Sequence, residues 1–176
     1  MNITIIGAGH VGLVTSACFA EMGNTVTCID IDNEKIKKLN KGIIPIYEPG
    51  LQKIILNNLN TCRLYFSTSF KDTMKTSNIF FIAVGTPEKK DGTVDMQYVY
   101  DVAENIGDYL HRKAVIINKS TVPIGTASKV RAIILNRLQV RKKKIAFHIV
   151  SNPEFLKEGD AIQDFMHPDR IIIGVN

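Results

Sequence analysis

Near its start the sequence reads Gly7-Ala8-Gly9-His10-Val11-Gly12, a G-x-G-x-x-G pattern in a chain of 176 residues. The apolar run Ile3–Ile6 before it is typical of a buried strand, and Val11–Met22 after it repeats apolar residues every four positions, as a helix does. In such a turn the first glycine permits the tight bend, the second lets the backbone approach a pyrophosphate, and the third lets helix and strand pack closely. The N-terminus of the helix also offers free N–H groups and a positive dipole end to phosphates. The pattern therefore predicts a phosphate-binding turn between a strand and a helix.

A carboxylate follows the second predicted strand, Thr25–Ile29. This residue is Asp30, and it lies 18 residues after Gly12. In the dinucleotide fingerprint an acid at this point accepts hydrogen bonds from the ribose hydroxyls of the adenosine. It would repel a 2′-phosphate, which favours NAD over NADP. Lys35, the nearest basic residue, lies five positions on rather than directly beside Asp30, so we expect NAD as the cofactor.

Short apolar runs alternate with helical patterns along the chain. The expected strands are Ile3–Ile6, Thr25–Ile29, Leu64–Ser67, Ile79–Val84, Ala114–Asn118, Ala146–Val150 and Arg170–Ile173. The expected helices are Val11–Met22, Asn33–Asn40 with Asp32 as its cap, Met96–Leu110 and Thr126–Leu138, with a loop and a short helix over Asn40–Asn60. Continuously apolar strands are typical of a parallel sheet covered on both faces. The sequence thus predicts one α/β domain, a doubly wound, mostly parallel sheet of Rossmann type.

Composition narrows the classes of partner. The formal charge of +5 is concentrated in Arg141–Lys144, a basic run that is more typical of a solvated loop than of a nucleic-acid-binding stripe. Cys18, Cys28 and Cys62 have no metal-ligand spacing, and scattered thiols without a secretory signal indicate the cytoplasm. No apolar run approaches the roughly 20 residues that span a bilayer. We therefore expect a cytoplasmic protein with no metal, no nucleic-acid partner and no membrane segment.

Polar turns follow three of the expected strands. They are Gly85-Thr86-Pro87, Lys119–Thr126 and Ser151–Gly159. Ligands of doubly wound sheets lie outside the carboxyl ends of the strands, so these turns lie where a nicotinamide and a substrate would bind. Hydroxyl residues, proline and glycine also mark turns in any protein, so no single turn of the three identifies a site.

With these motifs the chain resembles the UDP-glucose and GDP-mannose dehydrogenase family over its whole length. The matching stretches are Gly7–Leu13, Pro45–Leu51, Val84–Pro87, Ser120–Thr126 and Asn152–Gly159. Pro45–Leu51 and Ser120–Thr126 are most similar to the UDP-glucose branch. The resemblance implies a four-electron oxidation, in which two NAD molecules in succession take UDP-glucose to UDP-glucuronate through a thioester on a cysteine.

The resemblance also implies roles for individual residues. The implied cofactor set is Gly7, Gly9, His10, Val11, Gly12, Asp30, Lys35, Gly85, Thr86, Ser120, Thr121 and Glu158. The implied substrate set is Glu154, Phe155, Leu156, Lys157 and Glu158. As catalytic residues, Thr121 would help position the hydrolytic water, Glu154 would act as general base, and Glu158 would touch cofactor and substrate. Partial burial raises the pKa of a carboxyl group and so suits it to move protons, but an acid in the first turn of a helix is the plainer alternative for both glutamates.

The chain also departs from the family. The family's nucleophilic cysteine lies in a glycine-rich loop followed by Pro-Lys-Asp, and none of the three cysteines has these neighbours. The family's central helix and C-terminal nucleotide-binding domain are missing as well. We therefore expect residues 1–176 to be the NAD-binding domain of a longer, homodimeric enzyme, and to be inactive and monomeric alone. Two alternatives stay open: a GDP-mannose or UDP-N-acetyl-hexosamine dehydrogenase, and a non-catalytic NAD-sensing module that would not need Thr121 or Glu154.

Overall fold

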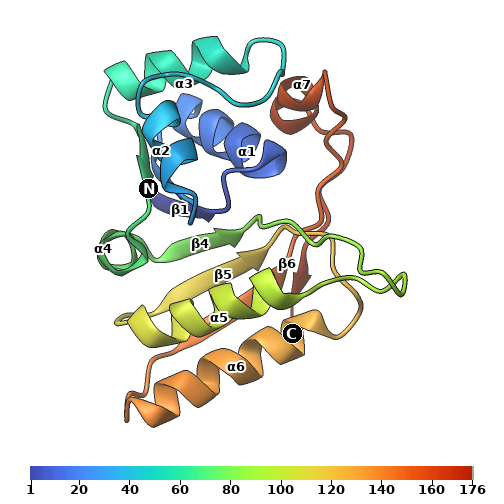
Figure 1. The fold of residues 1–176 in the computed structure, drawn as a ribbon. Coiled ribbons are helices and arrows are strands. Elements are labelled where there is room, and N and C mark those ends of the chain that lie inside the picture. Colours follow the sequence, from blue (N-terminus) through green and yellow to red (C-terminus); the bar gives the residue numbers. More distant parts are fainter. Residues whose placement is uncertain (176) are drawn as a thin grey trace.

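A computed structural model describes residues 1–175, which form a seven-stranded sheet with helices on both faces (Figure 1). In chain order the elements are β1 (Asn2–Ile6), α1 (His10–Glu21), β2 (Thr25–Ile29), α2 (Asn33–Leu39), α3 (Leu51–Asn60), β3 (Leu64–Ser67), α4 (Phe70–Thr76), β4 (Ile79–Ile82), α5 (Gln97–Tyr109), β5 (Ala114–Asn118), α6 (Thr126–Val140), β6 (Phe147–Ser151), α7 (Ala161–Met166) and β7 (Gly174–Val175). The strand order is β3-β2-β1-β4-β5-β6-β7. All neighbouring strands are parallel except β6 and β7. The expected doubly wound, mostly parallel sheet is confirmed.

The winding of the chain reverses between β1 and β4. From β1 the chain proceeds outward to β2 and β3, returns through α4, and continues through β4, β5 and β6 on the other side of β1. Ile6 at the end of β1 lies opposite Ile29 of β2 and Ile82 of β4, so all three strands end at the same edge. In open α/β sheets ligands bind at such a reversal point, outside the carboxyl ends of the strands.

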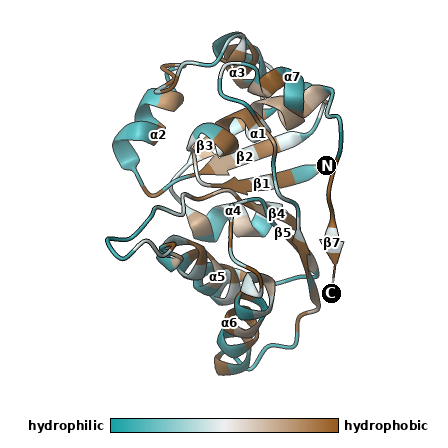
Figure 2. Cartoon of the chain, turned by 90° about the vertical axis from the view of Figure 1, so that its right-hand side faces the viewer, coloured by the Kyte–Doolittle hydropathy of each residue, from teal (hydrophilic) through white to brown (hydrophobic). Residues whose placement is uncertain are grey.

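Two apolar cores cover the two faces of the sheet. Successive residues of a strand point to opposite faces, so Phe81 belongs to the core under α1, α2, α3 and α7, while Phe80 and Ile82 belong to the core under α4, α5 and α6. Figure 1 shows α1, α3 and α7 on one side of the sheet and α5 and α6 on the other. The strands are mainly hydrophobic and the loops mainly hydrophilic (Figure 2). Burial on both faces explains why the strands are continuously apolar.

The expected elements are confirmed apart from one strand and two short helices, with bounds that shift by at most two residues. The predicted strand Arg170–Ile173 is wrong, because this segment has no regular secondary structure and only Gly174–Val175 pair with β6, antiparallel. Ile171 and Ile173 are 68% and 64% exposed, so their apolar run does not reflect burial. The helices α4 and α7 were not predicted, since seven and six residues give less than two turns of periodicity. The strand β4 ends at Ile82 rather than Val84.

Candidate functional site

The glycine-rich turn lies between β1 and α1, and its three glycines meet different surroundings. A Cβ atom on Gly7 would lie 2.5 Å from the carbonyl oxygen of Ala83, and Gly7 has a φ of +108°. A Cβ atom on Gly12 would lie 1.8 Å from the carbonyl oxygen of Gly7. Apart from its neighbours in the chain, no protein atom lies within 4 Å of the Cβ position of Gly9, and its extended backbone would accept any residue. The protein's own packing therefore requires Gly7 and Gly12, whereas Gly9 leaves free space at the N-terminus of α1.

Asp30 lies beside this turn at the end of β2. Its Oδ2 accepts hydrogen bonds from the backbone N–H of Ala8 at 2.8 Å and from the Lys35 ammonium at 3.1 Å, and its Oδ1 accepts one from the N–H of Asp32 at 3.0 Å. Partial burial opposes ionisation, but the two backbone hydrogen bonds and Lys35 outweigh it and hold the pKa of Asp30 below its ordinary value. The carboxylate is thus ionised and fixed in place.

Lys35 lies closer to Asp30 than its sequence position suggested. The two side chains form a half-buried ion pair, because the first turn of α2 brings position 35 back over the end of β2. The expectation that Lys35 is not beside Asp30 is therefore wrong. Asp32 also lines the adjoining cavity, so the negative charges of Asp30 and Asp32 together still exceed the positive charge of Lys35 there.

A cavity of about 420 Å³ joins the turn to Asp30. Its wall combines the glycine-rich turn, the end of β2, the end of β4 and one face of α5; the lining includes Gly7, Gly9, Asp30, Lys35, Ala83, Gly85, Tyr98 and Asp101. This volume lies within the range of small-molecule sites, and the lining is mostly apolar with a few placed polar groups, as in such sites. The cavity can therefore take a nucleotide with its phosphates toward Gly9 and its ribose toward Asp30.

Hydroxyl groups tie together the ends of β4 and β5. The Ser120 hydroxyl donates to the carbonyl oxygen of Val84 at 2.7 Å, and the Thr86 hydroxyl donates to the carbonyl oxygen of Thr121 at 2.9 Å. Thr121 itself is exposed, and Ser120 is buried. The structure thus brings Gly85, Thr86, Ser120 and Thr121 together at the edge of the sheet that also carries the glycine-rich turn.

The predicted substrate residues are only partly brought together. A second cavity of about 490 Å³ is lined by Glu154, Phe155 and Leu156, but not by Lys157 or Glu158. The Glu154 carboxylate is half-buried and accepts a hydrogen bond from the N–H of Leu156 at 2.6 Å. Lys157 and Glu158 are exposed. Neither glutamate lies in the first turn of a helix, because α7 begins only at Ala161, so that plainer alternative is excluded.

Lys119 was expected only as part of the polar turn Lys119–Thr126 and not as a site residue of its own. It is 7% exposed, and its ammonium lies 3.4 Å from Oδ1 of Asn152 and 5.8 Å from the ring centre of Phe165 in the second cavity. Burial lowers the pKa of Lys119, and the negative charge of Glu154 opposes this effect. A signal was present, since Lys119 directly precedes Ser120 at the end of β5.

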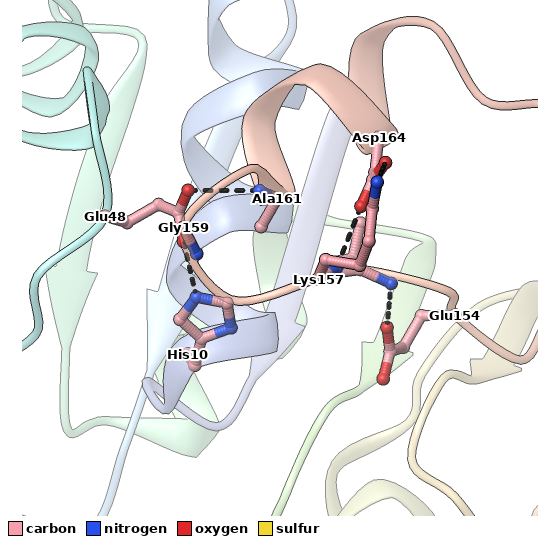
Figure 3. A network of polar contacts seen from close by, with 8 residues as sticks. His10, Glu48, Glu154, Lys157, Gly159, Ala161 and Asp164 are labelled. Carbon is pink, nitrogen blue, oxygen red and sulfur yellow. Dashed lines mark hydrogen bonds and ion pairs between the residues drawn. The ribbon is translucent and has the colours of Figure 1, made fainter.

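Glu48 was also missed as a site residue, although it belongs to the matched stretch Pro45–Leu51. Its buried carboxylate contacts the ring of His10 at 2.9 Å and accepts hydrogen bonds from the N–H groups of Gly159 at 2.9 Å and Ala161 at 3.0 Å (Figure 3). Burial opposes its ionisation, but His10 and the two N–H groups outweigh burial and lower the pKa of Glu48. His10, predicted to bind the cofactor, thus turns its ring to Glu48.

The remaining expectations concern metals, membranes and basic residues. Within residues 1–175 no group of three or more His, Cys, Asp or Glu side chains lies close enough to hold a metal ion. The same residues contain no helix of the length and hydrophobicity needed to cross a membrane. Arg141 of the basic run is not simply solvated, because its guanidinium donates to the carbonyl oxygens of Gly107 and Leu110 at 2.6 and 2.8 Å. It therefore ties the end of α6 to the end of α5.

Comparison with known proteins gives one consistent result. The family model for the NAD binding domain of the UDP-glucose/GDP-mannose dehydrogenase family matches residues 1–176. The chain is 49% identical over 99% of its length to UDP-glucose 6-dehydrogenase from Pseudomonas aeruginosa, and 48% identical over 98% to a UDP-glucose 6-dehydrogenase from Bacillus subtilis. These matches cover 38% and 37% of the two relatives, so the chain spans about two fifths of their length.

Solved structures agree with this result. A UDP-glucose dehydrogenase from Pyrobaculum islandicum matches with a TM-score of 0.91 and 35% identity, over 99% of this chain and 40% of that one. A GDP-mannose dehydrogenase from Pseudomonas aeruginosa, solved as a ternary complex, matches with a TM-score of 0.92 and 36% identity, over 100% of this chain and 41% of that one. Enzymes named for two different nucleotide sugars thus share this domain equally well.

Proposed function

The chain belongs to the UDP-glucose/GDP-mannose dehydrogenase family, whose NAD binding domain it forms, and we propose that it serves the oxidation of UDP-glucose to UDP-glucuronate. The observation that carries the proposal is the free space at Gly9, which opens into a cavity bounded by the fixed carboxylate of Asp30. The names of the relatives at 48% and 49% identity favour UDP-glucose. GDP-mannose or a UDP-N-acetyl-hexosamine is the second candidate, because solved relatives of that kind share the domain.

Residues of the first cavity would hold NAD. We propose that the backbone of Gly7, Gly9, His10, Val11 and Gly12 receives the pyrophosphate, since the N-terminus of α1 provides N–H donors and a favourable dipole there. Asp30, oriented by Lys35, would accept hydrogen bonds from the ribose hydroxyls and exclude a 2′-phosphate. When bound, NAD supplies the hydride acceptor. Gly85, Thr86, Ser120 and Thr121 would border the nicotinamide, because they share the same edge of the sheet.

The segment after β6 would act on the substrate. We propose that Glu154 is the general base, because Leu156 orients its carboxylate through one oxygen and the other oxygen can take a proton. Lys119 would lie close to it, since the charge of Glu154 acts on the Lys119 ammonium. Thr121 would help position the hydrolytic water, and Glu158 would contact cofactor and substrate. Phe155, Leu156 and Lys157 would complete the substrate contacts.

The organisation of the whole protein follows from the same proposal. Residues 1–176 would form one NAD-binding domain, and the relatives' greater length would hold the cysteine, the central helix and the domain for the nucleotide. We propose that the full-length protein is a homodimer formed through the central helix. We also propose a cytoplasmic location, and the three free thiols of this chain support that location. Size-exclusion chromatography with light scattering and cell fractionation of the full-length gene product test these two points.

Calorimetric titration of this chain with NAD tests the cofactor site. The variant Asp30→Ala removes the proposed ribose acceptor and is expected to weaken NAD binding about tenfold or more, because hydrogen bonds to a charged group contribute about 1.5–3 kcal/mol. It should also reduce the discrimination against NADP. The matched control is Glu34→Ala, which removes a carboxylate of equal charge from α2 outside the cavity. Equal affinities for the wild type and Asp30→Ala would contradict the proposed cradle.

The yield of NADH per limiting UDP-glucose, measured with the full-length gene product, tests the reaction. A yield of two per sugar is expected for a four-electron oxidation, and this chain alone is expected to bind NAD without producing NADH. If UDP-glucose gives none, the same assay with GDP-mannose and UDP-N-acetyl-hexosamines tests the second candidate. Binding of NAD without turnover of any nucleotide sugar would support a non-catalytic NAD-sensing module instead.

A further inference from the structure

Glu48 joins three segments that are far apart in the sequence. Its carboxylate contacts His10, the first residue of α1, and also receives the N–H groups of Gly159 and Ala161 from the loop that precedes and enters α7. These partners lie 38, 111 and 113 positions away in the chain. Figure 3 shows the carboxylate between the helix that carries His10 and the loop that carries Gly159. The contact therefore bridges the glycine-rich turn and the segment with the proposed substrate residues.

The chemistry of this contact makes its parts depend on one another. The Glu48 side chain is 1% exposed, so its charge must be compensated by nearby donors. Oε2 receives both His10 and Gly159, whereas Oε1 receives Ala161. Loss of the His10 contact would leave a buried carboxylate with one hydrogen-bond donor fewer. Oε2 would then be held by Gly159 alone, and its hydrogen bond from the N–H of Gly159 would be weaker. The position of His10 and the order of the loop are therefore linked.

Both ends of the link lie at functional positions. His10 follows Gly9 directly, so a ligand bound on the turn lies next to the residue whose ring contacts Glu48. At the other end, Lys157 is held by Asp164 of α7, through its backbone N–H at 2.8 Å and its ammonium at 3.3 Å. The loop is thus anchored on both sides of Glu158, and Glu154 lies within the same segment.

We propose that Glu48 is a positioning residue that transmits occupancy of the glycine-rich turn to the loop of residues 152–160. The inference rests on the proposed function, because the ligand on the turn is NAD. Glu48 touches neither cofactor nor substrate in this role. It couples filling of the first cavity to the order of the loop that carries Glu154 and Glu158.

Amide hydrogen exchange of this chain, followed by NMR with and without saturating NAD, tests the inference. The N–H groups of Gly159 and Ala161 are themselves the donors to Glu48, so their exchange reports the contact directly. In the wild type NAD is expected to slow their exchange about fivefold or more, the lower end of coupling between two sites. In His10→Ala, with NAD at a concentration that saturates this variant, the slowing should be lost. His148→Ala, an exposed histidine on β6, is the matched control and should keep it.

The outcomes separate the two proposals. If calorimetry detects no NAD binding, the proposed function fails and the inference falls with it. If NAD binds but the wild-type exchange is unchanged, or is slowed equally in His10→Ala, the inference alone is overturned. A purely structural contact would speed exchange in His10→Ala by the same factor with and without NAD. Should His10→Ala lose its native circular dichroism, Glu48→Gln provides the second variant, with the same expected loss of the response to NAD.

Discussion

Substitution of alanine at two glycines of the turn separates the packing of the protein from the binding of its cofactor. In Gly12→Ala the new methyl group would lie 1.8 Å from the carbonyl oxygen of Gly7. Rotation of a side chain cannot relieve this contact, because it joins a Cβ atom to a backbone oxygen. The backbone of Gly7 is also held in place by a hydrogen bond from its N–H to the carbonyl oxygen of Ile29 at 2.8 Å. Overpacking costs about 1–3 kcal/mol, and more when the neighbour is fixed backbone, against a gain of about 1 kcal/mol in helix propensity.

Gly9→Ala should behave in the opposite way. The new methyl group meets no protein atom within 4 Å, and the extended backbone at Gly9 suits alanine. The free energy of unfolding is therefore expected to change by less than about 1 kcal/mol, because alanine restricts the unfolded chain but is a poorer residue than glycine at the N-cap, the position that Gly9 occupies. The methyl group instead occupies the space proposed for the pyrophosphate, so NAD affinity should fall at least about tenfold, or about 1.4 kcal/mol.

Urea unfolding followed by circular dichroism, and calorimetric titration with NAD, measure the two effects. For Gly12→Ala we expect a net loss of about 2 kcal/mol, the upper end of the overpacking cost less the gain in helix propensity, which corresponds to a fall in Tm of roughly 4–8 °C in a domain of this size. For Gly9→Ala we expect a change in stability below about 1 kcal/mol together with weaker binding. Equal destabilisation by both substitutions, or undiminished NAD affinity in Gly9→Ala, would refute the conclusion that the free space at Gly9 belongs to the cofactor.

Three further predictions concern stability. The pKa of Glu48 is lowered from its ordinary value of 4.5, so the stability that its ionised form contributes is fully present above pH 4.5 and is lost as the pH falls through the folded-state pKa. The urea midpoint of the wild type should therefore fall more steeply below pH 4.5 than the midpoint of Glu48→Gln. Parallel pH curves for the two proteins would contradict this. Phe80→Ala, at a fully buried position of β4, should cost about 3–5 kcal/mol in urea unfolding, and a loss below 1 kcal/mol would mean that the core collapses around the gap. Arg141→Ala should cost about 1–3 kcal/mol by thermal or urea unfolding, because two carbonyl oxygens lose a charged donor, whereas the exposed Lys143→Ala should be neutral.

Local patterns were sufficient for most of the fold. The parallel strands and the helices α5 and α6 follow from hydrophobic periodicity, because a strand buried on both faces and a helix with one buried face leave different patterns in the sequence. The helix α1 is buried on most sides, and it was predicted from apolar residues at a spacing of four together with the glycine-rich turn before it. The failures have physical causes. Ile171–Ile173 is an apolar run that forms no strand, and α4 and α7 are too short for hydrophobic periodicity to reveal them. Their structure depends on contacts with the rest of the domain.

The candidate site also has some parts that the sequence predicts and others that only the fold reveals. By itself the sequence determined the glycine-rich turn, the carboxylate of Asp30 and the polar ends of the strands, because each depends on residues that are neighbours in the chain or on the common edge of a parallel sheet. Only the tertiary structure decided that Lys35 pairs with Asp30, that Lys119 is buried beside Asn152, and that Glu48 joins His10 to the loop before α7. The compensation of a buried charge comes from whichever donors the fold brings within hydrogen-bonding distance, and for Glu48 two of those donors lie more than 100 residues away.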